Sequence, residues 1–158
     1  MNESALDTGL KKEVQPLKIL LYSMMACIII FSLTSLIAKR YIEPLVLNKQ
    51  KSTNLFVIIL FTMVIALAIL RSFYKKNVKM LSATFATETE KFATYKKTLL
   101  KFYTGLEIVA MLGIMAFLFQ GHYNHLIIPL IVLVEMFLSM PTESKLNSYV
   151  FNTSNSNL

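Results

Sequence analysis

The sequence predicts an all-α, polytopic membrane protein in which four transmembrane helices form an antiparallel bundle. Hydrophobic residues make up 55% of the 158 residues and charged residues 16%, whereas soluble domains average roughly 45–50% and about 25%. The mean hydropathy is +0.57, and the apolar residues gather in four blocks. These blocks do not alternate polar and apolar residues as barrel strands do, so they are expected to cross the membrane as helices.

The first two spans are predicted over residues 19–38 and 55–73. Ile19 to Ala38 contains no charge, and its helical length of about 30 Å matches the hydrocarbon core of a bilayer. The second span is apolar up to Arg71, which Phe73 and Tyr74 follow as interfacial aromatic residues. Ser52, Thr53 and Asn54 offer an N-cap before this helix.

The third and fourth spans are predicted over residues 100–120 and 124–140, joined by a tight turn at Gly121. The fourth span is the shortest, and Pro141 is expected to close it because proline disrupts a helix. A bilayer must thin locally around so short a span, or interfacial residues must extend it.

The segments outside these spans are polar. Residues 1–15 could form a short surface helix or a tail, and Gly9 favours the tail. Between the second and third spans we expect a helical cytoplasmic extension, with its tip at residues 82–86. Thr87 and Glu90 have the spacing of a capping box at the start of the following helix. Residues 142–158 are expected to form a polar cytoplasmic tail that opens with a short helix.

The distribution of basic residues predicts that both termini are cytoplasmic. Counting Lys and Arg, the N-terminal segment, the second loop and the tail together hold twelve, and the first and third loops hold four. The positive-inside rule places the richer side in the cytoplasm. The four basic residues in the first loop run against this trend.

Two acidic residues lie within predicted spans, Glu107 in the third and Glu135 in the fourth. Each is fourteen residues from Gly121, so an antiparallel hairpin places both at the same depth. Carboxylates that faced each other there would share a proton, bind a cation or recruit a base. The candidate ion-pair partners are Lys18, Arg71 and Lys101.

A purely structural role for the two acids is the main alternative. Each carboxyl group would then be neutral or paired and would fix helix packing, with Tyr103 and Ser139 as hydrogen-bonding neighbours one turn away. Contact with a partner subunit is a further possibility. A stripe of small residues in the third span, Ala110, Gly113 and Ala116, predicts close helix packing.

The basic residues of the cytoplasmic extension form a candidate surface for anionic lipid headgroups or for an acidic partner. They lie within a turn or two of the membrane ends, and no nucleic-acid-binding module accompanies them, so no nucleic acid is expected to bind. The residues of this surface are Lys75, Lys76, Lys79, Lys96 and Lys97.

Motifs for catalysis are missing from the sequence. No nucleophile lies beside a base, no glycine-rich phosphate loop occurs, and Asp7 is the single aspartate. His122 and His125 lack a third ligand nearby and are expected to be exposed loop residues rather than metal ligands. Cys27 is the one cysteine, so no internal disulfide can form. We therefore expect no cofactor, no bound metal and no enzymatic activity.

The C-terminal half resembles a family of small four-helix membrane proteins of Bacteroidetes-type bacteria. The resemblance rests on Glu90-Lys91-Phe92, Tyr95, Leu99-Leu100-Lys101, Leu106-Glu107 and the segment Pro141-Thr142-Glu143-Ser144-Lys145. The sequence departs from the family pattern at Met140, where the pattern has arginine, and in the distance from Lys101 to Glu107. The resemblance implies a bacterial inner membrane and no particular activity.

Three functions are compatible with these features. The first is a non-enzymatic structural or accessory component of a membrane assembly, with another membrane protein or a second copy as its partner. The second is a small transporter, or a proton- or cation-coupled carrier, that uses Glu107 and Glu135. The third is a sensor of lipid or membrane stress that uses the basic extension.

Overall fold

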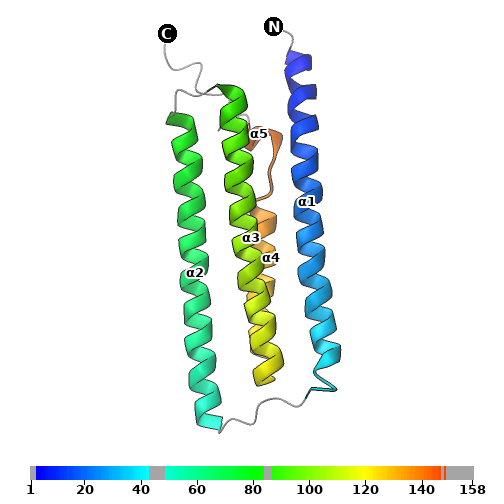
Figure 1. Ribbon diagram of the computed structural model, residues 1–158, viewed down its shortest axis with the longest axis vertical. Coiled ribbons are helices and arrows are strands. Elements are labelled where there is room, and N and C mark those ends of the chain that lie inside the picture. The colour runs from blue at the N-terminus through cyan, green and yellow to red at the C-terminus, as the bar shows by residue number, and fades with distance from the viewer. Residues whose placement is uncertain (1–2, 43–48, 84–86, 147, 149–158) are drawn as a thin grey trace.

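The computed structural model describes residues 3–42, 49–83, 87–146 and 148, and all regular structure in these ranges is helical. The predicted all-α class is confirmed. Three long helices come first, followed by a 3₁₀ turn, a shorter helix and a single helical turn; Figure 1 shows how the helices are arranged. In order they are α1 (Glu3–Ala38), α2 (Lys49–Ala83), α3 (Glu88–Gln120), η1 (Tyr123–Leu126), α4 (Ile127–Leu138) and α5 (Glu143–Leu146).

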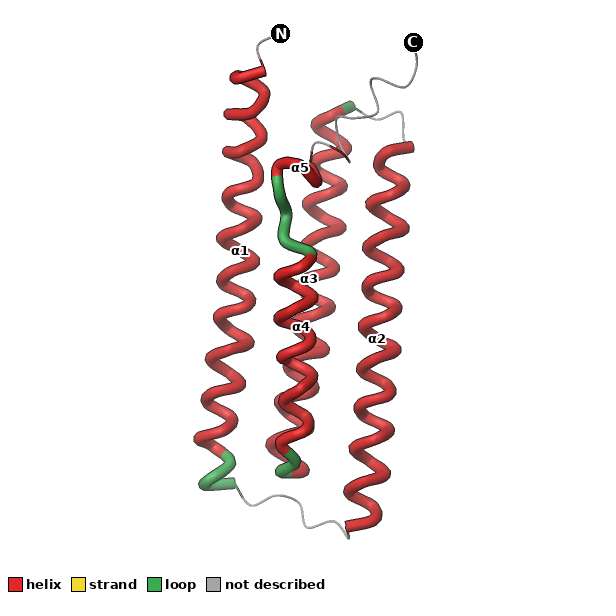
Figure 2. Tube along the Cα trace, turned by 180° about the vertical axis from the view of Figure 1, so that it is seen from behind, coloured by secondary structure: helices red, strands yellow, loops and turns green. Residues whose placement is uncertain are grey.

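Helix α3 is the centre of the fold. It packs against α1, α2 and α4, whereas α1 packs against α4 and α5. Figures 1 and 2 show α1 and α2 on opposite sides of α3, with α4 along a third side and successive long helices running in opposite directions. Half of the largest fully buried side chains accordingly come from α3, namely Tyr95, Leu99, Phe102, Tyr103, Leu106 and Phe117.

Three helical stretches are long and apolar enough to cross a membrane: Val14–Ala38, Thr53–Leu81 and Thr89–Gln120. The stretch Tyr123–Leu138 is a shorter apolar helix. Many large apolar side chains on these helices point outward, including Ile30, Ile58, Phe61 and Phe137, each more than half exposed. An outward face of this kind is suited to lipid rather than to water.

The turn between α3 and η1 brings α4 back along α3 in a fixed register. Gly121 adopts a left-handed backbone conformation (φ 72°), and its N–H donates to the Phe117 carbonyl. Eight residues before this turn, Gly113 lies against Ile128 and Pro129 at the start of α4. The predicted close packing at Gly113 is therefore present, and it allows the backbones of α3 and α4 to approach closely.

Lys39, one of the basic residues of the first loop, secures this turn from α1. Its Nζ donates to the Gly121 carbonyl at 2.5 Å and lies 3.6 Å from the centre of the Tyr123 ring. A cation at a helix C-terminus and over an aromatic face is stabilising in both contacts. This basic residue therefore serves the packing of the bundle at the end opposite the start of α1.

The predicted capping box is confirmed at the start of α3. The Thr87 side chain accepts a hydrogen bond from the Glu90 N–H, and the Glu90 carboxylate accepts one from the Thr87 N–H. The extension of α2 beyond Arg71 is also confirmed, since this helix continues to Ala83. Most of the predicted hairpin tip, residues 84–86, lies outside the described residues.

The expectation of an N-terminal tail is wrong, because α1 begins at Glu3 and continues through Gly9 and Pro16. A proline inside a helix removes a backbone hydrogen bond and costs about 3 kcal/mol. Tertiary packing offsets this cost, since one face of α1 stays buried on both sides of the proline. The residues of this face next to Pro16 are Val14, Leu17 and Leu21.

Two further helix ends differ from the prediction. Helix α2 begins at Lys49 rather than after a cap at residues 52–54, because no helix breaker lies in that stretch and a capping residue is a preference rather than a requirement. Helix α4 ends at Leu138, before Pro141, because the residues ahead of a proline disfavour helical geometry. The predicted helix in the tail is the single turn α5, and residues 149–158 lie outside the described residues.

Replacement of Gly113 by alanine is expected to destabilise the protein. The new Cβ would lie 2.9 Å from the Ile128 Cβ and 3.2 Å from the Pro129 ring, and neither group can rotate away. Overpacking of this kind costs about 1–3 kcal/mol, more than the gain of about 1 kcal/mol from the helix propensity of alanine. Thermal unfolding in detergent, followed by circular dichroism, measures the loss.

Gly105→Ala is the matched control. Its Cβ would meet the Leu70 methyl groups, which end a flexible side chain that can rotate. The two substitutions share the propensity gain, so Gly105→Ala is expected to be close to neutral. Equal losses of stability in the two variants would contradict the close α3–α4 packing.

Candidate functional site at the end of the fourth helix

The candidate site arises because α4 is shorter than its neighbours. Together, η1 and α4 contain four and twelve residues, a length of about 26 Å. This length falls short of the roughly 30 Å hydrocarbon core. Figure 2 shows α1, α2 and α3 continuing well past the end of α4. The last backbone carbonyls of α4 therefore end beside these helices and need hydrogen-bond donors.

Ser139 and Tyr103 provide two of these donors. The Ser139 hydroxyl donates to the main-chain carbonyl of Glu135 at 2.8 Å and to that of Met136 at 3.1 Å. The buried Tyr103 hydroxyl donates to the Ser139 carbonyl at 3.0 Å. The expected pairing of these hydroxyls with the two carboxylates is wrong, because the carbonyls at the end of α4 receive them instead.

Lys145 supplies a third donor from the far side of the turn. The short helix α5 folds back over the end of α4, and the Lys145 Nζ donates to the carbonyls of Leu138 at 2.9 Å and Met140 at 3.2 Å. The positive charge also opposes the partial negative charge that collects at a helix C-terminus. The Lys145 side chain thereby caps the C-terminal end of α4.

An ion pair joins α4 to α2 at the same level. The Arg71 Nε lies 3.4 Å from the Glu135 Oε1, and the Glu135 side chain is 20% exposed whereas that of Arg71 is 56% exposed. Helices α2 and α4 both pack on α3 and hardly touch each other in the described parts of the chain. The pair therefore bridges a groove between two helices that share little other contact.

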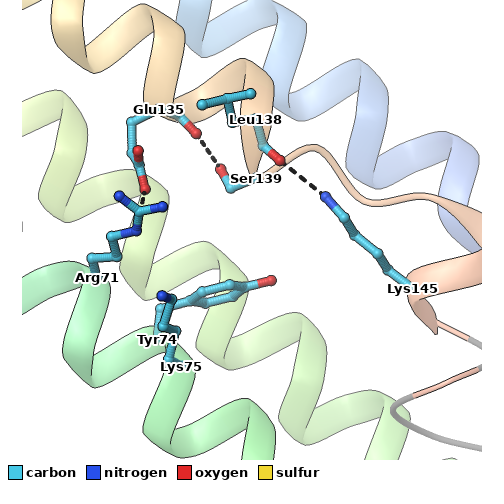
Figure 3. A pocket seen from close by; sticks show the side chains of 7 residues that line it. All are labelled: Arg71, Tyr74, Lys75, Glu135, Leu138, Ser139 and Lys145. Carbon is cyan, nitrogen blue, oxygen red and sulfur yellow. Dashed lines mark hydrogen bonds and ion pairs between the residues drawn. The ribbon is translucent and has the colours of Figure 1, made fainter.

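A pocket of about 160 Å³ opens beside this ion pair (Figure 3). Its charged side chains are three basic and one acidic, so the pocket carries a positive balance when all four are ionised. The carboxylate of Glu135 turns toward the guanidinium of Arg71 across the groove, while Lys145 reaches in from α5. The lining residues are Arg71, Tyr74, Lys75, Glu135, Leu138, Ser139 and Lys145.

Glu107 lies on the other side of the hairpin from Glu135. On α3, Gly105 faces α2, because a Cβ there would meet Leu70. Successive helical residues turn by about 100°, so Glu107 points about 200° away from that face. Glu135 faces α2 through its pair with Arg71. The two acids match in distance from the turn, but the structure does not bring them together.

The other candidate residues are separated from Glu135. Lys18 lines a different pocket, with Val14, Gln15 and Glu143. Lys101 is exposed on α3 and forms no ion pair with any described residue. The five lysines of the candidate lipid surface, Lys75, Lys76, Lys79, Lys96 and Lys97, are all exposed.

The two histidines differ in their surroundings. His122 is exposed as expected, but the expectation for His125 is wrong because its side chain is fully buried. The 3₁₀ turn directs its ring inward, where Nε2 lies 3.0 Å from the Gln120 Oε1 and the Phe56 ring makes an edge contact. Within the described ranges, no three His, Cys, Asp or Glu residues are grouped as metal ligands would be.

No protein-family model, curated protein or solved structure matches this chain. The site is therefore interpreted from its own geometry. That geometry combines a capped helix end, one ion pair and an open pocket with a positive balance. Sequence reasoning identified Arg71 and Glu135 but missed Lys145 as a site residue. The available signal was Pro141, which stops a helix, followed by Lys145 four residues later.

The Tyr103→Phe variant is expected to lose about 1–3 kcal/mol of stability, because it leaves the buried Ser139 carbonyl without its donor. Tyr22→Phe is the matched control, since its exposed hydroxyl makes a 3.7 Å contact with the Met140 sulfur and is expected to contribute less than about 0.5 kcal/mol. Thermal unfolding in detergent compares the two. Similar losses would contradict the capping role of Tyr103.

Proposed function

We propose that this chain is a small integral membrane protein that crosses a bacterial inner membrane four times, with both termini in the cytoplasm. We further propose that it acts as a non-enzymatic structural or accessory component of a membrane assembly, with another membrane protein or a second copy as its partner. The following observations support these proposals.

Support for four crossings comes from the outward apolar side chains of α4 as well as of the long helices. Leu130, Val134 and Phe137 are each more than half exposed, although α4 packs along α3 on its other face. Placing them in lipid removes this apolar surface from water. Helix α4 then ends close to the inner boundary of the bilayer, where Arg71 and Lys145 lie.

Support for cytoplasmic termini comes from charge. The start of α1, the end of α2, the start of α3 and α5 lie at one end of the bundle (Figure 1). Most of the basic residues of the chain belong to these segments, which the positive-inside rule assigns to the cytoplasm. The bacterial inner membrane is proposed from the resemblance of the C-terminal half to small bacterial four-helix proteins.

The observation that carries the accessory role is the use made of polar groups at the end of α4. Glu135 bridges to Arg71, and Tyr103, Ser139 and Lys145 donate to backbone carbonyls. Glu135, Tyr103 and Lys145 thus join different helices, as packing residues in a structural component do, and Ser139 caps the end of α4 itself. The apolar sides of α1 and α2 that face away from α3 leave surface for a membrane partner.

Affinity purification from the native host in a mild detergent, with quantitative mass spectrometry, tests the accessory role. The expected result is a partner recovered in a fixed ratio to this chain, because a component of an assembly shares its stoichiometry. An unrelated tagged membrane protein of similar size and abundance serves as the control. Recovery of this chain alone, as a monomer, would contradict the proposal.

The alternative proposal is a small transporter or a proton- or cation-coupled carrier. One observation favours it: Glu107 lies within a predicted span and, in the part of the chain that the structure describes, has no ion-pair partner. Under this proposal, liposomes containing the protein pass protons or sodium ions, and Glu107→Gln or Glu135→Gln abolishes that flux while the helix content is kept. Under the accessory role, the wild-type protein gives no flux above that of empty liposomes.

A further inference from the structure

The ion pair at the end of α4 does not use all the hydrogen-bond donors of the Arg71 guanidinium. Strong charge-assisted pairs have N···O distances of about 2.7–2.9 Å and are often bidentate. The contact from the Arg71 Nε to the Glu135 Oε1 is longer, at 3.4 Å, and more than half of the Arg71 side chain is exposed. The guanidinium can therefore bind a second anion from the solvent side without leaving the groove.

Lys75 adds a second positive charge on the Arg71 side of the pocket. It lies four residues after Arg71 on α2, so the two side chains share one face of that helix, and both line the pocket. Lys145 adds a third positive charge, held at the rim by two backbone carbonyls. One carboxylate, that of Glu135, opposes these three charges, and the positive charge that remains favours an anion as ligand.

The position of the pocket indicates the kind of anion. Below it, α4 presents Leu138, Phe137 and Val134 to the outside, each more than half exposed. Above it, α2 continues into the polar, lysine-rich extension. A ligand that fits both environments has a negatively charged head and apolar chains, with the head at the boundary and the chains along α4. The pocket itself has a volume of about 160 Å³.

We propose that this pocket binds the phosphate group of an anionic phospholipid from the inner leaflet, with Arg71 and Lys75 as the main ligands. Arginine suits this role because its planar fork matches phosphate oxygens. Glu135 competes with the phosphate for Arg71 and limits the affinity. The inference rests on the proposed membrane location, and it names a lipid as one partner of the chain.

Two adjacent lysines provide a matched test. Lys75 lines the pocket, whereas Lys76 is exposed about 100° further around α2 and does not line it. Lys75→Gln and Lys76→Gln remove the same charge at nearly the same height above the membrane. A specific site distinguishes the two variants, and a diffuse attraction of basic residues to an anionic surface does not.

Native mass spectrometry of the full chain, released from detergent micelles containing phosphatidylglycerol, counts the retained lipid. The expected result is one retained phosphatidylglycerol per chain, with phosphatidylcholine retained much more weakly. The dissociation constant is expected to rise about tenfold in Lys75→Gln and Arg71→Gln and to stay unchanged in Lys76→Gln. Glu135→Gln is expected to bind phosphatidylglycerol more tightly, because it frees the guanidinium.

Three results would overturn the inference. Equal losses of affinity in Lys75→Gln and Lys76→Gln would show a diffuse surface instead of a site. Unchanged binding in Lys75→Gln would remove the pocket from the interaction. Displacement of the lipid by millimolar inorganic phosphate would assign the pocket to a free anion. Both lysines are exposed, so their variants are expected to fold even if Arg71→Gln does not.

The outcome is independent of the proposed accessory role. Failure to retain phosphatidylglycerol would leave a partner found by affinity purification unaffected. Equally, recovery of this chain alone would not alter a difference in lipid binding between Lys75→Gln and Lys76→Gln. A negative result in one experiment therefore does not imply a negative result in the other.

Discussion

The structure depends on a mismatch of length between α4 and the three helices around it. Twelve helical residues and one 3₁₀ turn bring the chain back from the turn at Gly121 without reaching as far as α1, α2 and α3. The backbone carbonyls at the end of this helix must be paired, because an unpaired one is costly in an apolar setting. Tyr103, Ser139 and Lys145 meet this requirement. The ion pair, the pocket and its positive balance all lie around this helix end.

The central position of α3 makes this arrangement possible. It contacts each of the other long helices and α4, so its small residues and its large aromatic residues set the spacing of the whole bundle. Gly113 admits the start of α4, and Phe102 stacks on Tyr74 of α2 at 4.7 Å between ring centres. Gly121 sets the register of α4, which brings Ser139 opposite Tyr103 and Glu135 to the depth of Arg71. Packing around α3 thus determines which polar groups meet at the end of α4.

The sequence predicted the helical class, the four apolar stretches and the capping box, because hydropathy and capping spacing are local signals. It also predicted that Glu107 and Glu135 lie equally far from the turn. It could not predict their directions, because one residue along a helix changes the direction of a side chain by about 100°. The burial of His125 and the role of Lys145 were missed for a related reason, since each depends on a turn whose geometry hydropathy does not encode.

The depth of α4 can be measured directly by electron paramagnetic resonance on the protein in liposomes. Nitroxide labels would be placed singly at Leu130, Val134, Leu138 and Ser144, after replacement of Cys27 by serine. Oxygen, which concentrates in lipid, is expected to reach Leu130 and Val134 best, and a water-soluble nickel reagent is expected to reach Ser144 best, with Leu138 at the crossover. Equal access of the nickel reagent to Leu130, Val134 and Ser144 would contradict the proposal that α4 lies in the membrane with its capped end at the inner boundary.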